Sequence, residues 1–280
     1  MQHLLVTGAS GLLGRRVARQ ALAAGWQVTG TTYRSDHRIE GVTMRRLDLR
    51  AGAEQLIAEL RPDAVVHTAY SRESSEIWPV TARGAAAVAR GCAQAGARLI
   101  HLSSDALFAG REAPYTEDDE PDPIMPYGAA KAAAELLVQE HSPEAMIIRT
   151  SLLYGLPGSE PLDPYQRMVR EMIADPARGV LFTDEYRCPL CADDLAAAIV
   201  ELLDQRVGGV LHIAGPAALN RYQFGQLLAS SAGLDAGMLR AGSGRVQCRP
   251  MRVVLHSRRV EALLRTPLRN PYDVLGGAKP

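Results

Sequence analysis

The sequence predicts an α/β fold in which helices cover both faces of a doubly wound parallel sheet, with a smaller mixed α/β lobe on the C-terminal side. Two observations support this prediction. Short apolar runs alternate with helical runs through residues 1–154, and a glycine-rich turn directly follows the first apolar run. The chain has 280 residues, of which 47% are hydrophobic and 22% charged, so it can bury the core of a globular enzyme.

The glycine-rich turn occupies residues 8–14 (Gly-Ala-Ser-Gly-Leu-Leu-Gly). The apolar run at residues 3–7 is short enough for a buried strand, and residues 15–24 follow with helical apolar spacing. A Rossmann-type dinucleotide site requires this order, because glycines let the backbone approach the pyrophosphate and the helix N-terminus offers free N–H groups. The G-x-x-G-x-x-G spacing differs from the more common G-x-G-x-x-G. The candidate cofactor contacts in the turn are Gly8, Ser10, Gly11, Leu12, Leu13 and Gly14.

The βαβ pattern continues to residue 154. Strands are expected at residues 27–32, 42–47, 64–68, 98–103 and 145–150. Helices are expected at residues 53–60, 77–95 and 127–140. Parallel strands joined by helices build a sheet that is covered on both faces, so residues 1–154 are predicted to form a dinucleotide-binding Rossmann domain.

The pattern changes after Tyr154. Residues 155–164 are rich in Gly and Pro and are expected to form a loop. Helices are then expected at residues 165–174, 193–203 and 222–232, and strands at residues 180–182 and 210–213, whereas residues 236–280 are the least regular. We expect residues 155–280 to form a substrate-binding lobe over the carboxyl edge of the sheet, with about residues 192–214 returning to the sheet.

Charge and hydropathy argue against several classes of protein. The 31 basic and 31 acidic residues give a formal net charge of zero, which provides no basic surface for nucleic acid. The sequence has no run of roughly 18 uninterrupted apolar residues, the length of a membrane span. The strand expected at residues 3–7 leaves no room for a signal peptide before it. We therefore expect a cytoplasmic protein that binds a small molecule.

Four cysteines, Cys92, Cys188, Cys191 and Cys248, are too few for a disulfide framework in a chain of this length. Cys188 and Cys191 have the C-x-x-C spacing that metal and redox sites use. A zinc site needs two more ligands, and no second C-x-x-C or H-x-x-H accompanies this one. We expect free thiols and no metal here.

One lysine stands out by its position. Only Lys131 and Lys279 are lysines among the 31 basic residues, and Lys131 follows Tyr127 by four residues. The surrounding segment is rich in Ala, Leu and Glu, so the two side chains are predicted to lie one helical turn apart on the same face. A lysine ammonium is a compact charge that can assist ionisation of a phenol, whereas the arginine guanidinium is a rigid fork. The spacing alone also fits an ordinary helix surface, and the glycine turn favours the chemical interpretation.

Together the motifs resemble those of the extended short-chain dehydrogenases/reductases, and more narrowly those of the dTDP-4-dehydrorhamnose reductase group. The resemblance depends on the glycine turn, on His-Leu-Ser-Ser-Asp at residues 101–105 and on the segment from Tyr127 to Lys131. Matching residues at 114–123, 148–155, 187–189 and 194–196 extend it over nearly the whole chain.

The resemblance implies a catalytic group of three residues. Tyr127 would donate the proton, Lys131 would lower the pKa of that phenol and hold the nicotinamide ribose, and Ser104 would hydrogen-bond the substrate carbonyl. These roles are chemically consistent, because a free phenol has a pKa of about 10 and needs a nearby cation to exchange protons at neutral pH. Tyr127 and Lys131 thus also count as cofactor contacts. Further cofactor contacts are implied for Asp48, Leu49, Thr68 and Ala69.

The end of the second expected strand bears on the choice of cofactor. A carboxylate there would bind the adenosine ribose of NAD. The chain instead continues as Thr31-Thr32-Tyr33-Arg34-Ser35, where Arg34 could pair with a 2′-phosphate. We therefore expect NADP(H) to be favoured over NAD(H), although a loop arginine is often merely solvated.

Three departures from the family pattern are visible. Thr81 stands where the family usually has the Asn of an N-x-x-G motif, Ala106 replaces a common tyrosine, and an Asn-Phe pair is missing near Tyr165. The last two departures concern the substrate side. Arg187 and Arg249 suit a diphosphate or another anion, and a structural ion pair would explain each equally well. The candidate substrate contacts are Asp105, Ala106, Phe108, Arg187 and Arg249.

Three functional hypotheses follow. The first is an NAD(P)H-dependent reductase that transfers a hydride to the 4-keto group of a nucleotide-activated deoxysugar or a related keto substrate. The second is a sugar-nucleotide epimerase or dehydratase with bound NAD, although a dehydratase usually has an Asp-Glu pair after the serine where this chain has Asp105-Ala106. The third is a non-catalytic, dinucleotide-binding regulatory subunit. A homodimer is also considered.

Overall fold

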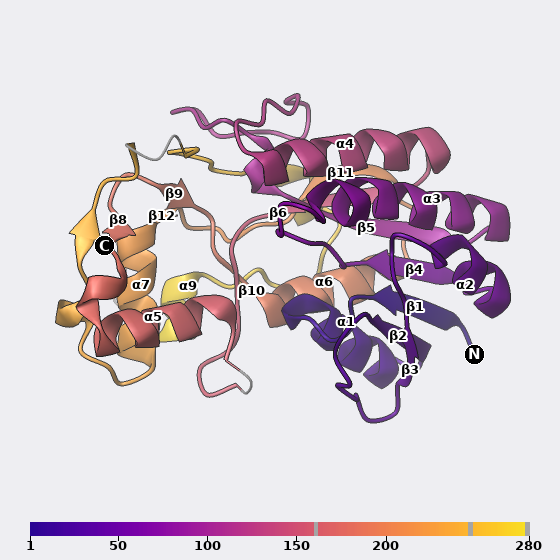
Figure 1. Ribbon diagram of the computed structural model, residues 1–280, viewed down its shortest axis with the longest axis horizontal. Coiled ribbons are helices and arrows are strands. Elements are labelled where there is room, and N and C mark those ends of the chain that lie inside the picture. Colours follow the sequence, from indigo (N-terminus) through magenta and orange to yellow (C-terminus); the bar gives the residue numbers. More distant parts are fainter. Residues whose placement is uncertain (160–161, 246–248, 278–280) are drawn as a thin grey trace.

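Seven parallel strands form the central sheet of the computed structural model, which describes residues 1–159, 162–245 and 249–277. The strand order is β11-β6-β5-β4-β1-β2-β3, so the sheet is wound outward from β1 in both directions (Figure 1). The strands are β1 (His3–Thr7), β2 (Gln27–Thr32), β3 (Thr43–Arg46), β4 (Ala64–His67), β5 (Arg98–Ser104), β6 (Met146–Thr150) and β11 (Gly209–His212). The predicted α/β fold with a doubly wound parallel sheet is confirmed.

Helices cover both faces of this sheet (Figure 1). One face carries α1 (Leu12–Ala23) and α6 (Ala192–Leu203), and the other carries α2 (Ala53–Leu60), α3 (Gly84–Ala95) and α4 (Pro126–His141). Because successive strand residues point to opposite faces, Leu4 and Val6 pack with α1 and α6, whereas Leu5 packs with the other three helices. Burial on both sides explains why the inner strands β1 and β4 are mostly continuous apolar runs, whereas the edge strand β3 is polar and partly exposed.

The helix expected at residues 77–95 is divided into two parts. Residues Ile77–Arg83 form a π-helix (η1), and only Gly84–Ala95 are α-helical. Pro79 is the third residue of η1, a first-turn position at which helices tolerate proline. The apolar periodicity of residues 77–95 did not reveal the change from π- to α-helix at Gly84.

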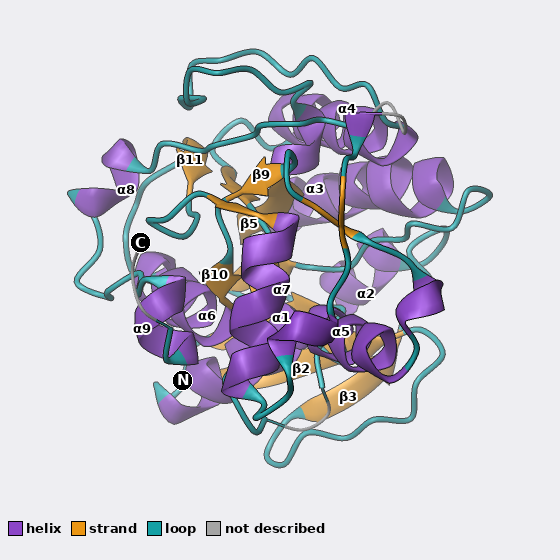
Figure 2. Cartoon of the chain, turned by 90° about the vertical axis from the view of Figure 1, so that its left-hand side faces the viewer, coloured by secondary structure: helices purple, strands orange, loops and turns teal. Residues whose placement is uncertain are grey.

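A second lobe is built on α5 (Pro164–Ala174), α7 (Arg221–Ser231) and α9 (Pro271–Leu275), which lie side by side at the left of Figure 1 and toward the viewer in Figure 2. Three pairs of two-residue strands connect it: β7 (Leu153–Tyr154) with β10 (Leu190–Cys191), β9 (Tyr186–Arg187) with β12 (Leu219–Asn220), and β8 (Leu181–Phe182) with β13 (Ala241–Gly242). Strands this short have no readable periodicity. The sequence analysis therefore missed all of them except β8.

After residue 154 the chain returns to the sheet at α6 and β11, and again at Val260, which packs into the same core. Helix α6 packs against α1, and β11 pairs in parallel with β6 at the edge of the sheet. The remaining short elements are the 3₁₀ turns η2 (Asp105–Leu107), η3 (Pro176–Arg178) and η4 (Ala236–Met238), and the helix α8 (Arg258–Glu261). Across the described ranges, the helices are all too short or too polar to span a membrane.

Candidate active site

The glycine turn is packed so tightly that two of its glycines have no substitute. Gly8 has φ 71°, and a Cβ added to it would lie 2.9 Å from the Ala69 Cα. A Cβ on Gly14 would lie 2.4 Å from the Gly8 carbonyl oxygen and 2.8 Å from the Thr68 hydroxyl. Thus the turn after β1 is pressed against the residues that follow β4. The predicted cofactor contacts Thr68 and Ala69 lie directly beside the turn.

Helix α1 begins with free backbone donors. Its N-cap, Gly11, offers no side chain, and the first turn contains no acidic residue. Amides without a protein partner at a helix start suit an anion such as a pyrophosphate. Ser10 lies at this end of the helix, and its hydroxyl is 3.3 Å from the hydroxyl of Thr32 on β2. The Leu13 side chain is 8% exposed and belongs to the core. This cradle of glycine and free N–H groups fits a dinucleotide.

Charged residues gather beyond the end of β2. Arg34 is 65% exposed at its side chain and pairs with Glu76 at 3.2 Å and with Glu73 at 3.8 Å. The guanidinium carbons of Arg34 and Arg50 lie 5.0 and 5.3 Å from the centroid of the Tyr33 ring. Arg34 is therefore exposed to solvent next to a second arginine that the sequence analysis did not select.

Asp48 and Leu49 have different environments. Asp48 pairs with Arg50 at 2.6 Å, and this hydrogen bond holds the pKa of the carboxyl below its usual range. Leu49 is 8% exposed and approaches α3 so closely that a Cβ on Gly84 would lie 3.0 Å from its Cβ. The side chain of Leu49 thus serves the core.

The position of Tyr127 depends on the glycine that follows it. Helix α4 begins at Pro126, and a Cβ on Gly128 would lie 2.0 Å from the Ala106 carbonyl oxygen. Glycine therefore lets the first turn of α4 rest on η2, directly after Ser104. Burial raises the pKa of the Tyr127 phenol well above its ordinary value, and Tyr70 adds to this rise.

Lys131 lies deep beneath this turn. It is 3% exposed, and its ammonium donates a 2.7 Å hydrogen bond to the Leu102 carbonyl on β5. Burial lowers its pKa to about 8, the charge of Glu135 opposes the shift, and Arg72 adds to it. His67 and His101 stack nearby at 5.3 Å, and burial together with the Lys131 charge keeps both imidazoles neutral at ordinary pH by lowering their pKa values.

Ser104 ends β5 and leads into a buried polar chain. Its hydroxyl accepts from the Ala106 N–H at 3.2 Å and lies 3.4 Å from an Asp105 carboxylate oxygen. The other oxygen of Asp105 accepts from the Ser151 hydroxyl at 2.6 Å and lies 3.7 Å from the Arg187 Nε. Burial raises the pKa of Asp105, and the Arg187 charge opposes this effect. The carboxylate is thus engaged inside the protein.

Glu185 lies among three arginines of the second lobe. It is 2% exposed and lies 2.7 Å from Arg249, 3.5 Å from Arg187 and 3.9 Å from Arg221. With Asp105 beside Arg187, two carboxylates face three guanidinium groups, so the cluster keeps a positive charge. Both explanations given for Arg187 and Arg249 therefore remain open, because an ion pair and an excess of charge coexist.

Phe108 is not brought to the same place. Its side chain is fully buried and stacks on Tyr115 with ring centroids 4.0 Å apart. Ala106, by contrast, is partly exposed next to Tyr127, and it contributes its backbone to Ser104 and Gly128. The structure therefore gives Phe108 a core role, unlike the substrate contact expected from the sequence.

The sequence analysis missed two residues of the site, Tyr70 and Arg72. The rings of Tyr70 and Tyr127 lie 5.6 Å apart, and the Arg72 guanidinium carbon lies 4.9 Å from the Tyr127 centroid. Both follow Thr68 and Ala69 at the carboxyl end of β4, where open α/β sheets bind ligands. That location was the available signal for their role.

The C-x-x-C residues lie in the interior. Cys92, Cys188 and Cys191 are buried free cysteines, and burial raises the pKa of the Cys188 thiol to about 11. Within residues 1–159, 162–245 and 249–277, no three His, Cys, Asp or Glu side chains are grouped as metal ligands would be. Cys248 and Lys279 lie outside the described residues.

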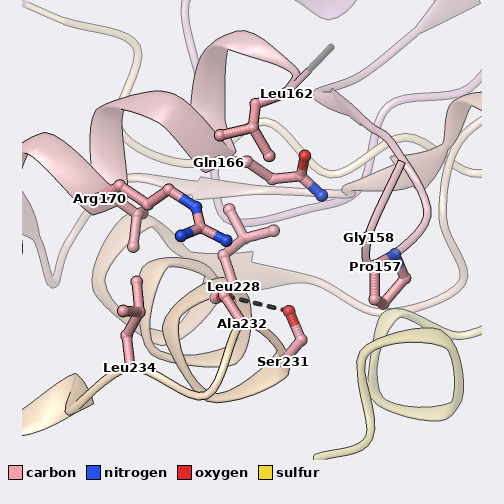
Figure 3. A pocket seen from close by; sticks show the side chains of 10 residues that line it. Pro157, Gly158, Leu162, Gln166, Arg170, Leu228, Ser231, Ala232 and Leu234 are labelled. Atoms are coloured by element: carbon pink, nitrogen blue, oxygen red, sulfur yellow. Dashed lines mark hydrogen bonds between the residues drawn. The ribbon is translucent and has the colours of Figure 1, made fainter. Parts of the chain in front are cut away.

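A small hollow in the second lobe is separate from this group (Figure 3). It measures about 30 Å³ and lies between α5, α7 and the loop at Pro157 and Gly158. That volume is about the size of one water molecule, so it is too small for a sugar. The predicted catalytic side chains do not line it.

The sheet order, the glycine cradle and the group of Ser104, Tyr127 and Lys131 define an extended short-chain dehydrogenase/reductase. Residues 1–272 match the model of the RmlD substrate binding domain. The chain belongs to the RmlD substrate binding domain family.

Relatives and solved structures agree with this assignment. The chain is similar to the dTDP-4-dehydrorhamnose reductase of Mycolicibacterium smegmatis, with 31% identity over 291 residues, covering 99% of this chain and 85% of the relative. It is also similar to the methionine adenosyltransferase 2 subunit beta of Rattus norvegicus, with 29% identity over 260 residues, covering 85% and 75%. A crystal structure of dTDP-4-dehydrorhamnose reductase from Bacillus anthracis in complex with NADP superposes with a TM-score of 0.78 at 22% identity, covering 98% and 97%. At that identity the superposition shows a common fold.

Proposed function

We propose that this protein is an NADP(H)-dependent reductase that transfers a hydride to the 4-keto group of a nucleotide-activated deoxysugar or a related keto substrate. The observation that supports this best is the close contact between Gly128, which follows Tyr127, and the short helix η2, which begins directly after Ser104. This contact brings the start of α4, which carries Tyr127, to the residues that follow Ser104 at the carboxyl end of β5. Lys131 is buried one turn further along α4. A carbonyl held there would meet two O–H donors from different elements.

The side chains divide the reaction among them. When bound, a reduced nicotinamide dinucleotide supplies the hydride. Ser104 donates a hydrogen bond to the carbonyl oxygen, which stabilises the negative charge that develops on it. Tyr127 gives its proton to the same oxygen, so that the ketone becomes an alcohol. Lys131 would hold the nicotinamide ribose, and its ammonium would add positive charge near the phenol.

The same proposal divides the chain into two functional parts. Residues 1–154 would bind the dinucleotide, and residues 155–280 would bind the substrate, with about residues 192–214 returning to the sheet. The pairing of β11 with β6 supports the last point. Preference for NADP(H) is supported by Arg34 and Arg50, whose guanidinium groups both lie near the Tyr33 ring. Arg187 and Arg249 would face the diphosphate of the sugar nucleotide.

A small-molecule substrate, a cytoplasmic location and a homodimer belong to the same proposal. The net charge of zero supports a small molecule over nucleic acid. A dehydratase is less well supported, because Asp105 is engaged by Ser151 and Arg187 and is followed by alanine.

The test is turnover with a panel of nucleotide 4-keto sugars. The purified protein is mixed with NADPH or NADH and each sugar, and the loss of reduced-nicotinamide absorbance is followed. We expect consumption of NADPH with at least one sugar and loss of that activity in Tyr127→Phe. Tight NAD that remains bound through purification, with no net consumption of reduced cofactor, would instead indicate an epimerase.

The regulatory-subunit hypothesis is a second candidate, because of the similarity to the methionine adenosyltransferase 2 subunit beta. The two candidates make different predictions for Tyr127→Phe. A reductase loses turnover on the panel, whereas a regulatory subunit shows no turnover in either form and binds the dinucleotide equally well in both. Titration of both forms with NADPH beside the panel assay separates them.

A further inference from the structure

Arg72 is the cation that lies over the Tyr127 ring. Its guanidinium carbon is 4.9 Å from the centroid of Tyr127 and 5.7 Å from that of Tyr70. Lys131 has a different neighbour, because its ammonium lies 5.5 Å from the Tyr70 centroid and is hydrogen-bonded to Leu102. In this structure the positive charge next to the phenol therefore comes from the loop after β4, not only from the helix that carries the tyrosine.

The loop that carries Arg72 is held by Thr81. The Ser71 N–H donates to the Thr81 hydroxyl at 3.1 Å, and the same hydroxyl donates to the Ser71 carbonyl at 3.0 Å. Thr81 is 1% exposed, so these two hydrogen bonds to the backbone are protected from water. It anchors the residue between Tyr70 and Arg72, and it shows what replaces the asparagine expected at this position.

The acidic residues of the same segment leave Arg72 uncompensated. Glu73 and Glu76 pair with Arg34, and Glu76 also lies 3.6 Å from Arg50. Among the residues that the structure describes, Arg72 forms no ion pair. Its interactions with titratable groups are with Tyr70, Tyr127 and Tyr165. Arg72 is exposed, so water screens part of the positive charge that acts on them.

We propose that Arg72 is a further catalytic residue, whose charge stabilises the phenolate that Tyr127 becomes when it gives up its proton. The proposal rests on the reductase function proposed above. It makes Arg72 a second cationic side chain near the phenol, besides Lys131. In the reduction, the O–H bond of Tyr127 breaks, the proton forms a new O–H bond on the substrate oxygen as the carbonyl carbon accepts the hydride, and water later returns a proton to the phenolate. Arg72 keeps its protons throughout and acts by charge alone.

Several other groups face Tyr127 and bear on its ionisation. Tyr70 from the β4 loop and the buried Asp105 from η2 both disfavour the phenolate, whereas Arg72 opposes them and lowers the pKa. Lys131 lies one turn along α4 beneath these rings. Tyr165 of α5 faces Arg72 from the second lobe. An opposite charge at this distance lowers a pKa by roughly 1–3 units. Because Arg72 is exposed, it offsets only part of the rise that burial causes.

Titration of the Tyr127 phenol tests this without turnover. Because the pKa of Tyr127 is already raised, a fluorinated tyrosine with a lower intrinsic pKa is placed at position 127, so that the midpoint falls at a pH where the chain stays folded. The ultraviolet absorbance of phenolate is then followed against pH for the full chain, alone and with NADP⁺, and the Tyr127→Phe curve is subtracted to isolate this position. We expect Arg72→Gln to move the phenolate midpoint upward by roughly 1–3 pH units, a 10- to 1,000-fold smaller phenolate fraction at a given pH. Arg72→Lys should recover part of the shift, because it retains the charge. The matched control is Arg83→Gln, which removes an exposed arginine at the end of η1.

The outcomes are distinct from those of the turnover assay. A midpoint that is the same in wild type and Arg72→Gln, with circular dichroism showing both folded, overturns the proposal. Weaker NADP⁺ binding with an unchanged midpoint also overturns it, because Arg72 would then be a cofactor contact only. An upward midpoint shift supports the proposal even where the sugar panel shows no activity, so failure of the reductase function is recognised separately. With an active substrate, the pH above which reduction slows should rise in Arg72→Gln by the same amount.

Discussion

The Lys131 ammonium and the Leu102 backbone carbonyl are joined by a 2.7 Å hydrogen bond between helix α4 and strand β5. Lys131 is 3% exposed, so this bond holds a charged group at a fixed depth beneath the site. The flexible side chain of a lysine can reach that carbonyl and place a compact ammonium there, whereas an arginine would bring a wider, planar guanidinium. The bond explains why this arginine-rich chain uses lysine here.

Lys131→Arg is expected to reduce turnover strongly. The planar guanidinium is too wide for the buried position and cannot place its charge at the same point. We expect a loss of roughly 10²- to 10⁴-fold, comparable with Tyr127→Phe, as is typical of losing positioned acid–base catalysis. The double mutant should be far less impaired than the product of the single effects, because the two residues act as a unit. Steady-state turnover of the four forms measures this, with thermal unfolding as a control. A folded, fully active Lys131→Arg protein would show that the assignment is wrong.

Lys131→Met is expected to stabilise the protein near neutral pH. The pKa of Lys131 is lowered to about 8 from 10.5, first by burial. Below about pH 8 both folded and unfolded chains carry the proton, and the folded state bears the cost of the buried charge. Between these two pKa values the unfolded chain binds a proton that the folded chain lacks, so wild-type stability rises with pH and levels off above 10.5.

The gain from Lys131→Met should therefore depend on pH. We expect about 1–2 kcal/mol near pH 7, which includes the loss of the Leu102 hydrogen bond, and no gain above about pH 10, where the wild-type chain has lost the cost of the buried charge. Urea unfolding at the two pH values measures the difference. An equal gain at both would mean that Lys131 carries no charge penalty in the folded state.

Arg34→Ala is expected to narrow the preference for NADPH over NADH. A charge-assisted hydrogen bond to the 2′-phosphate contributes about 1.5–3 kcal/mol, so the affinity ratio should fall by roughly 10- to 100-fold. Arg50→Ala should narrow it further, because Arg50 lies on the same tyrosine. Titration with both cofactors measures the ratio, and Arg38→Ala, an exposed arginine of the same loop, serves as the control. Equal affinities in the wild type, or a preference for NADH, would contradict the cofactor proposal.

Gly128→Ala is expected to separate the start of α4 from η2. The added methyl group would lie 2.0 Å from the Ala106 carbonyl oxygen, so the helix must move away from Ser104. We expect a loss of stability of about 1–3 kcal/mol, as for other overpacked sites, together with a loss of turnover. Ala129→Gly is the matched control, because it costs about 1 kcal/mol of helix propensity without a clash. Turnover at or above the wild-type level in folded Gly128→Ala would mean that this close contact is not needed.

The alternation of apolar strands and helices was enough to predict the parallel sheet, and most of its elements end within two residues of the expected positions. Periodicity is a local property, and both faces of the sheet are buried, so the signal was strong. It failed where other local rules apply. The first part of the helix expected at residues 77–95 is a π-helix, which apolar periodicity does not distinguish from an α-helix. The two-residue strands of the second lobe are too short to show a period.

For the site, motifs identified candidates, and packing decided their surroundings. The spacing of Tyr127 and Lys131 placed both on one face of a helix, but it did not reveal that Lys131 is bound to Leu102. Phe108, expected to contact substrate, instead stacks on Tyr115 in the interior. The catalytic and cofactor roles of the predicted residues stay predictions until the variants are measured.

The sequence by itself determined the class of fold, the glycine cradle and the tyrosine–lysine pair, because each depends on a pattern of residues that are close together in the sequence. Only the tertiary structure decided which distant residues complete the site. It brought Arg72 over Tyr127 from 55 positions away, and it gathered Arg187, Arg221 and Arg249 around Glu185. Such contacts depend on how the loop after β4 packs beside α4 and how the second lobe closes on η2. No local pattern records them, because the partners are separated in sequence and meet only at the carboxyl edge of the folded sheet.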